Sequence, residues 1–222
     1  MIRNKLVAEG LGTTFLLATV VGSGIMAERL ASGNLAVALL ANAVATGVVL
    51  YVLISLFSPI SGAHFNPTVT IIEWIERRIS MQTALLYIFV QYFSAVLGVV
   101  LAHLMFELPI FTASEHIRNG PAQWLSEFLA TFGLLLTILL GSKSIPKQVP
   151  VLVACYITGA YWFTSSTSFS NPAVTFARSL TNTFAGIRPN DVVLFSLAQI
   201  LGAIAALGVA KILISSKLPK VS

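Results

Sequence analysis

Two Asn-Pro pairs carry the residue types that can do chemistry in this sequence. The motifs read Asn66-Pro67-Thr68 and Asn171-Pro172-Ala173, and each lies in a stretch too short and too polar to span a membrane. Asparagine is a strong helix N-cap and proline is favoured at the first helical position, so each motif predicts the start of a short helix. An asparagine amide can donate hydrogen bonds to a passing oxygen atom, while the positive end of a helix dipole repels cations. The pair therefore predicts a site for neutral polar molecules.

Non-helical backbone is expected directly before each motif, over residues 61–65 and 164–170. At membrane depth such backbone is tolerated only where it is buried in protein or lines a water-filled cavity. The two segments therefore predict a ladder of carbonyl acceptors along a pore.

The elements that must position these motifs are membrane-spanning helices. The 222 residues are 56% hydrophobic and only 9% charged, too little charge for a soluble chain of this length. A helix needs roughly 20 residues to cross the hydrocarbon core of a bilayer. We expect six spans, at residues 6–26, 35–57, 81–106, 122–142, 149–167 and 190–214, within a single channel domain over residues 1–222.

An internal repeat, over approximately residues 1–106 and 122–214, orders these spans. In each half a glutamate and a threonine precede the Asn-Pro pair and a glutamine follows it: Glu9, Thr13, Asn66 and Gln91, then Glu127, Thr131, Asn171 and Gln199. Three spans per repeat give the two copies opposite orientations in the membrane, with the functional site at their interface. The predicted fold class is an all-α membrane protein with six transmembrane helices and two re-entrant half-helices in an inverted repeat.

The basic residues predict the topology. The formal net charge is +5, and with both termini cytoplasmic most lysines and arginines fall on the cytoplasmic side, as the positive-inside rule requires. The cytoplasmic set is Arg3, Lys5, Arg77, Arg78, Lys143, Lys147, Lys211, Lys217 and Lys220, against Arg29, Arg118, Arg178 and Arg188 outside. These charges flank apolar spans, so the lipid bilayer is the expected partner and nucleic acid is not. Short loops indicate a bacterial inner membrane.

Enzymatic chemistry is not expected. The sequence has one cysteine, Cys155, which excludes an internal disulfide and a cysteine-based metal cluster. It also offers no nucleophile–base pair, metal-ligand cluster or phosphate loop, so we predict no cofactor and no metal.

These motifs resemble the aquaporin and aquaglyceroporin (major intrinsic protein) family over nearly the whole chain. The resemblance rests on residues 61–67, on Asn171-Pro172-Ala173 and on the paired glutamates Glu9 and Glu127. It implies the aquaporin fold, a homotetramer with one pore per subunit, and facilitated diffusion of water or small neutral solutes. It also implies that Glu9 and Glu127 pin the half-helices by accepting hydrogen bonds from loop amides, although intramembrane carboxylates are functional by default.

The sequence departs from the family at its selectivity filter. The first motif has Thr68 in place of alanine, and Val174 stands where the family usually has an arginine. Counting from the asparagines places the other filter positions at Thr46, Gly159 and Ser168. None of the four filter residues is charged or aromatic, so a wide constriction is expected.

Two further residues leave alternatives open. Arg178 lies four residues after Val174, about 6 Å further outward on the same helix face. It either moves the missing positive charge to the outer vestibule or is a solvated or headgroup-bound arginine. Cys155 lies one turn from Gly159, and is either a pore-facing thiol or an inert small hydrophobe.

The leading function is a passive wide-bore channel for small uncharged solutes: arsenite and related metalloid hydroxides or glycerol-like polyols, together with water. The small filter without arginine resembles a bacterial subgroup linked to metalloid transport. Neutral arsenite resembles glycerol in shape and hydroxyl groups. The alternatives are an ordinary water channel and a proton-coupled secondary transporter, since inverted repeats occur in both classes.

Overall fold

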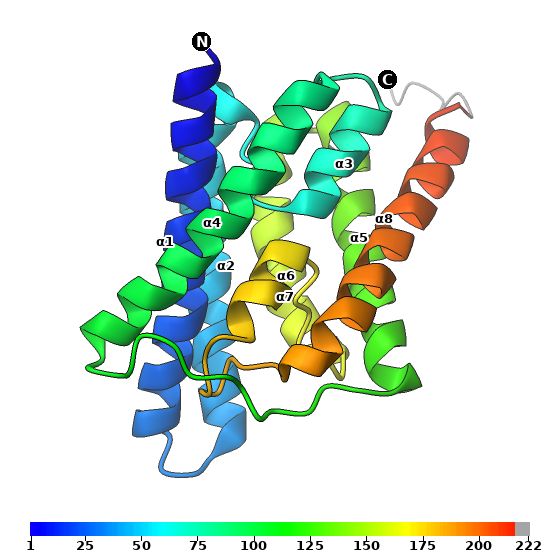
Figure 1. Cartoon of the computed structure of the whole chain (residues 1–222). Coiled ribbons are helices and arrows are strands. Elements are labelled where there is room, and N and C mark those ends of the chain that lie inside the picture. Colours follow the sequence, from blue (N-terminus) through cyan, green and yellow to red (C-terminus); the bar gives the residue numbers. More distant parts are fainter. Residues whose placement is uncertain (216–222) are drawn as a thin grey trace.

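Six long helices cross the molecule and two short helices begin in its middle (Figure 1). The computed structural model describes residues 1–215, and its α-helices follow one another along the chain. They are α1 (Ile2–Leu30), α2 (Leu35–Ser61), α3 (Pro67–Ile75), α4 (Met81–Met105), α5 (Pro121–Ser144), α6 (Val149–Phe163), α7 (Pro172–Arg178) and α8 (Val192–Ser215). A helix occupies most of each of the six predicted spans, and the predicted fold class is confirmed.

The fifth span is shorter than predicted. α1, α2, α4, α5 and residues 189–214 are long and apolar enough to cross a membrane, whereas α6 has 15 residues. At 1.5 Å per residue, α6 rises only about 22 Å. The chain leaves the helix at Thr164, whose hydroxyl donates to the carbonyl oxygen of Ala160 at 2.6 Å, and continues through a turn and left-handed residues toward Asn171. The predicted helical residues 164–167 are therefore loop.

The two halves pack in the same way. α1 packs on α4 and α2, α5 packs on α8 and α6, and α2 meets α6 between the halves. Small residues allow these contacts, as is common between membrane helices. Gly98 of α4 faces the backbone of Thr14 on α1, and Gly202 of α8 faces the backbone of Phe128 on α5.

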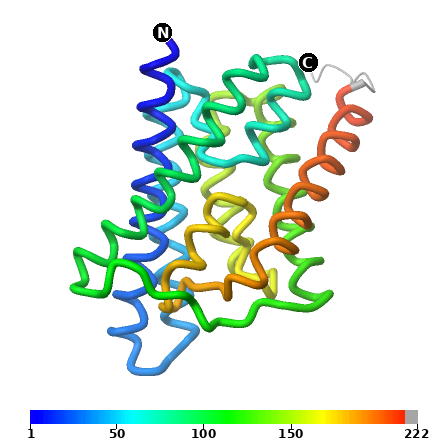
Figure 2. The backbone as a smooth tube through the Cα atoms, in the orientation of Figure 1, coloured from blue at the N-terminus to red at the C-terminus, as the bar shows by residue number. Residues whose placement is uncertain are grey.

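The half-helices α3 and α7 begin in the centre of the molecule and run to opposite ends (Figures 1 and 2). Asn66 caps α3 by accepting from the N–H of Thr68 at 2.9 Å, and Asn171 caps α7 by accepting from Ala173 at 3.0 Å. A proline occupies the first turn of each helix, as the motifs predict.

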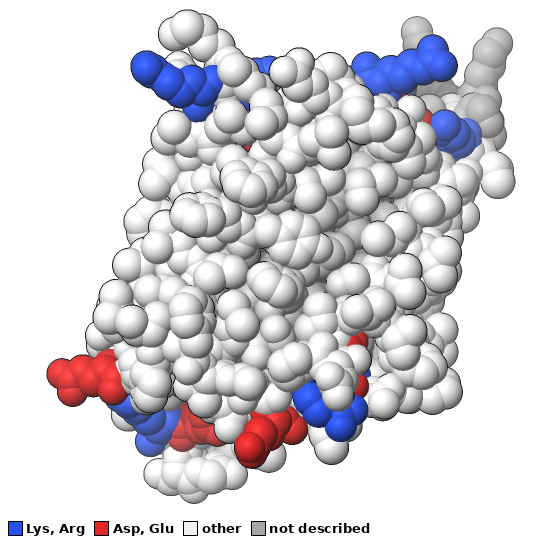
Figure 3. Space-filling model, viewed as in Figure 1, with Lys and Arg blue, Asp and Glu red and all other residues white. Residues whose placement is uncertain are grey.

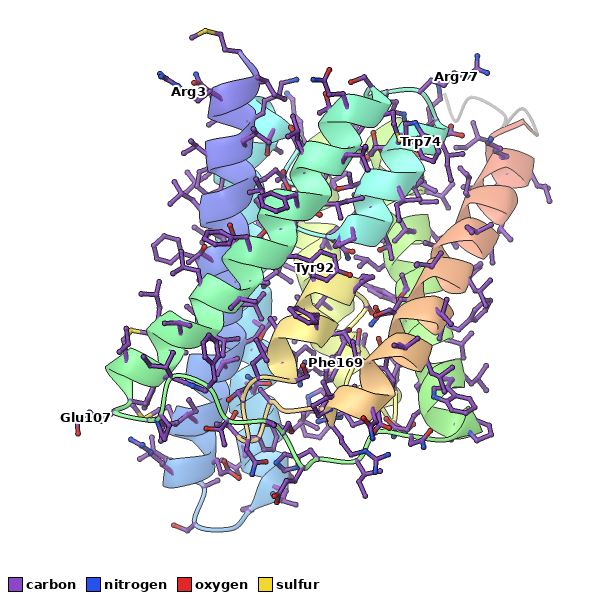
Figure 4. All side chains as sticks on the ribbon, viewed as in Figure 1. Arg3, Trp74, Arg77, Tyr92, Glu107 and Phe169 are labelled. Carbon is purple, nitrogen blue, oxygen red and sulfur yellow. The ribbon has the colours of Figure 1, made fainter. Side chains whose placement is uncertain are left out.

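The charged side chains gather at the two ends of the molecule (Figure 3). Arg3 and Arg77 lie at the end where α1 starts and α8 finishes, which we call the basic end, and Glu107 lies at the other, which we call the loop end (Figure 4). The loop end holds the connections 106–120 and 179–191. Lys217 and Lys220 lie outside the described residues.

The close approach of α8 to α5 gives a first prediction. A Cβ atom at Gly202 would overlap the carbonyl oxygen of Phe128, so Gly202→Ala must push the two helices apart. Overpacking of this kind costs about 1–3 kcal/mol, and we expect a lower midpoint of thermal unfolding in detergent, followed by circular dichroism. Gly208→Ala is the control on the same helix, because a Cβ there meets no atom within 4 Å. Equal midpoints for the two variants would contradict the prediction.

Candidate functional site

Glu9 binds the first re-entrant loop, residues 62–66 between α2 and α3. It is fully buried on α1. Its carboxylate accepts hydrogen bonds from the Ser61 hydroxyl at 2.7 Å and from the backbone N–H groups of His64 and Phe65 at 2.9 and 2.8 Å. The Gln91 amide on α4 donates to the same carboxylate at 2.9 Å. A buried charge satisfied in this way has the geometry of a structural anchor.

Glu127 repeats the arrangement in the second half. It is fully buried on α5 and accepts from the N–H groups of Phe169 and Ser170 at 2.9 and 2.8 Å. Gln199 on α8 donates to it at 2.6 Å. Both glutamates therefore have the contacts that the resemblance implied for a structural role.

The two loops share an unusual backbone. Ala63 and Phe65 have φ values of 51° and 49°, and Ser168 and Ser170 have φ values of 51° and 49° at the equivalent places. Non-glycine residues in this left-handed region cost on the order of 1–3 kcal/mol each and persist only where the surroundings fix them. The carboxylate contacts of Glu9 and Glu127 provide that fixation.

The two asparagines join the loops to each other. The side-chain amide of Asn66 donates to the carbonyl oxygen of Ser170 at 2.7 Å, and that of Asn171 donates to the carbonyl oxygen of Phe65 at 2.7 Å. The Thr68 hydroxyl also donates to the side-chain oxygen Oδ1 of Asn66 at 2.8 Å, which fixes the orientation of that amide. Each amide group has two N–H donors, so one donor per asparagine is left for a solute.

Both asparagines line a cavity of about 110 Å³ between the two halves. A single water needs roughly 10–15 Å³ by such a measure, so the cavity has room for several. One wall is aliphatic and comes from α1, α2, α5 and α6: Leu16, Val20, Leu50, Ile54, Leu134, Ile138, Val153 and Ile157. The other wall comes from the loops and includes His64, Asn66, Ser168, Ser170 and Asn171.

A second cavity continues the first toward the basic end. It measures about 450 Å³, and Glu73, Arg78 and Lys147 line it. The two cavities share lining residues: Ile54, Gly62, His64, Val69, Ile138 and Val149. The two cavities are therefore adjacent, and the one lined by both asparagines also reaches Val174 and Arg178 of α7.

Three of the four predicted filter residues line the cavity: Thr46, Ser168 and Val174. Gly159 does not. The cavity-lining residues of α6 are Val153, Ile157 and Tyr161, at four-residue spacing. Gly159 precedes Tyr161 by two residues and is therefore exposed on the far side of the helix.

Cys155 is also exposed, on the same outward face of α6 as Gly159. It lies two residues from both Val153 and Ile157, which face the cavity. Of the two alternatives for Cys155, the exposed position favours a side chain that does not face the cavity. The helical phase of α6 could not be counted from Asn171, because the non-helical residues 164–170 intervene.

Tyr161 and Phe169 line the cavity but were not predicted. The Tyr161 hydroxyl lies 3.2 Å from that of Thr46, which joins α6 to α2. The four-residue stripe of Val153, Ile157 and Tyr161 is a signal that could have identified Tyr161. The four predicted filter residues are small, but these two aromatic residues line the same cavity.

Arg178 also lines the cavity, and only 2% of its surface is exposed. Its Nε–H donates to the carbonyl oxygen of Ala185, and its guanidinium carbon lies 3.3 Å from the centre of the Phe169 ring. Within residues 1–215 its two Nη groups have no hydrogen-bond partner. Arg178 is therefore buried beside the cavity, and its guanidinium group is part of the lining.

An inverted repeat with two capped half-helices around a polar passage defines a membrane channel. The model of the family described as "Major intrinsic protein" matches residues 1–163. "Aquaglyceroporin AqpS" of Rhizobium meliloti (strain 1021) is 50% identical over 218 residues, covering 98% of this chain and 93% of the relative. The "Glycerol uptake facilitator protein" of Streptococcus pneumoniae (strain ATCC BAA-255 / R6) is 31% identical over 155 residues, covering 61% of this chain and 63% of the relative.

A solved structure has the same fold. The aquaglyceroporin from Plasmodium falciparum superposes with a TM-score of 0.77 at 17% identity, covering 97% of this chain and 98% of the other. The chain belongs to the major intrinsic protein family, a family of membrane channels and not of enzymes.

The contacts of Glu127 give a second prediction. Glutamine offers one acceptor oxygen, so Glu127→Gln leaves the N–H of either Phe169 or Ser170 facing an amide donor. A buried donor without an acceptor costs on the order of 1–3 kcal/mol, and we expect a lower thermal midpoint together with loss of solute flux. Glu115→Gln, at an exposed position of the loop 106–120, is the control. A Glu127→Gln variant with unchanged midpoint and flux would show that the carboxylate is not the anchor.

Proposed function

We propose that this chain is a passive channel for small uncharged solutes: arsenite and other metalloid hydroxides, glycerol-like polyols, and water. The observation that carries the proposal is the pair of adjacent cavities, one of which is lined by both asparagines. Asn66 and Asn171 each keep one amide donor available there, which suits solutes with hydroxyl groups. The names of two relatives, an aquaglyceroporin and a glycerol uptake facilitator, support the same solute class.

The two walls of the cavity suit a polyol better than an ion. The aliphatic wall includes Leu50, Ile54 and Ile157, and it offers nothing to replace the hydration shell of an ion. The loop wall supplies amide and hydroxyl groups for the oxygen atoms of a solute. Metalloid hydroxides such as neutral arsenite carry hydroxyl groups in a similar arrangement.

Charge in the passage opposes cations. The N-termini of α3 and α7 point toward each other at the centre, and Arg178 adds a full positive charge at the last residue of α7. We infer that Arg178 takes over the electrostatic part of the role that arginine has at the Val174 position in the family. Because Val174 is smaller than the arginine that the family usually has there, we expect the cavity at that turn of α7 to admit solutes larger than water.

The assembly and topology follow from the same proposal. Exposed apolar side chains cover the outer faces of the long helices, including Phe89, Phe93 and Leu201. They suit contact with lipid and with other copies in a homotetramer. The basic end, with Arg3 and Arg77, would face the cytoplasm of a bacterial inner membrane, with both termini on that side.

Val174→Arg tests the width of the passage. The added guanidinium would fill space beside Arg178 and add a second charge. In proteoliposomes followed by stopped-flow light scattering, we expect glycerol and arsenite flux to fall at least about tenfold, the effect of a barrier about 1.4 kcal/mol higher. Water flux should be affected less.

Val174→Ala is the matched control and should keep solute flux at or above that of the wild type, because it only removes methyl groups. A wild type that passes water alone would be an ordinary water channel. Flux that saturates and requires a proton gradient would identify a coupled transporter.

Arg178→Ala tests the charge. A cation about 8 Å from the guanidinium meets a repulsion of about 2 kcal/mol at an effective dielectric constant of ~20. We therefore expect methylammonium permeability to rise by about tenfold or more, with glycerol flux maintained. Equal methylammonium permeability in variant and wild type would remove Arg178 from the barrier.

A further inference from the structure

The loop 106–120 is bonded to the segment that follows α7. The N–H groups of Thr112 and Ser114 donate to the carbonyl oxygens of Leu180 and Ser179, each at 3.0 Å. Further along, the N–H of Arg188 donates to the carbonyl oxygen of His116 at 2.7 Å. The loop thus lies along residues 179–188 and ends close to Arg118.

Arg118 connects three chain segments at the loop end. Its Nε–H donates to the carbonyl oxygen of Gly186 and its Nη1 to that of Ser166, both at 2.9 Å. Its own backbone N–H donates to Asp191 at 2.9 Å. Arginine can hold two acceptors at fixed directions because its donors form a planar fork, which lysine lacks.

Arg118 and Arg178 contact the same aromatic ring. The guanidinium carbons lie 5.0 Å and 3.3 Å from the centre of the Phe169 ring, respectively. The partner of the Arg178 Nε–H is Ala185, next to the Gly186 carbonyl that Arg118 holds. Both contacts that fix the Arg178 side chain, the ring and the carbonyl, are therefore adjacent to contacts of Arg118.

We propose that Arg118 is a positioning residue for the charge barrier: it holds Phe169 and residues 185–186 so that the Arg178 guanidinium stays over the cavity. Arg118 itself does not line the cavity. Its effect on selectivity passes through Arg178. The inference rests on the proposed function, since it assumes that solutes pass Arg178.

A double-mutant cycle in proteoliposomes tests this role, with methylammonium permeability and glycerol flux measured for Arg118→Gln, Arg178→Ala and the double variant. We expect Arg118→Gln to raise methylammonium permeability by about threefold or more while glycerol flux is kept. In the Arg178→Ala background, the second substitution should change nothing further, because its only route to the barrier is gone. Arg118→Lys should resemble Arg118→Gln, since it keeps the charge but loses the fork.

Arg29→Gln is the matched control. Arg29 also donates to a backbone carbonyl, that of Phe106 at 3.1 Å, and lies 5.2 Å from the Phe106 ring, but it does not line the cavity. We expect wild-type selectivity from it. Thermal midpoints of all variants separate loss of positioning from loss of folding.

Two results would overturn the proposal. One is wild-type selectivity in Arg118→Gln when Arg178→Ala has lost it. The other is an additive effect in the double variant. If Arg118→Gln does not fold, Phe169→Leu decides, because it removes the ring between the two arginines and must raise methylammonium permeability on its own. Failure of the proposed function looks different: Arg178→Ala itself would then leave selectivity unchanged.

Discussion

Two stretches of non-helical backbone lie at the centre of this helical bundle, and their polar groups must be satisfied there without bulk water. Glu9 and Glu127 meet this requirement. Each places a fully buried carboxylate under a loop, and each is itself held by a glutamine from the neighbouring long helix. The left-handed residues, the directions of α3 and α7, and the positions of both asparagines depend on these anchors. Because a carboxylate only accepts hydrogen bonds, it suits a loop whose N–H groups converge.

Most polar groups that line the cavity come from the two loops. The loops donate N–H groups to the glutamates, while aliphatic side chains from four long helices line the rest of the cavity. At the loop end this division ends, and Tyr161, Phe169 and Arg178 meet Thr46 and Val174. The arginine of this chain, Arg178, lies one turn after the position where the family usually has one, and its contacts come from a different part of the chain. Arg178 rests on the connections between helices, through Ala185 and Phe169, and not on the wall formed by the spans.

The sequence predicted the parts of the structure that depend on local rules. Asn66-Pro67 and Asn171-Pro172 act as caps wherever they occur, and the glutamates could be identified because the two halves repeat. Gly159 could not be placed correctly, since the turns of α6 are separated from Asn171 by loop residues that no periodicity describes. Tyr161 was missed for the same reason. Arg118 had no signal at all: its partners are backbone carbonyls of distant loops, and any residue type can supply a carbonyl.

The hydrogen bonds between the two motifs also set an order for biogenesis. Glu9 is 55 residues from His64 and 56 residues from Phe65 in the sequence. Its hydrogen bonds to the first loop can therefore form as soon as the first three spans exist. The Asn66 amide, however, waits for Ser170, 104 residues further on, and the Phe65 carbonyl waits for Asn171. At a synthesis rate of roughly 5–20 residues per second, the first half spends several seconds in the membrane with its central polar groups uncapped. The nascent chain must therefore keep that half hydrated, or shielded by the insertion machinery, until its counterpart arrives.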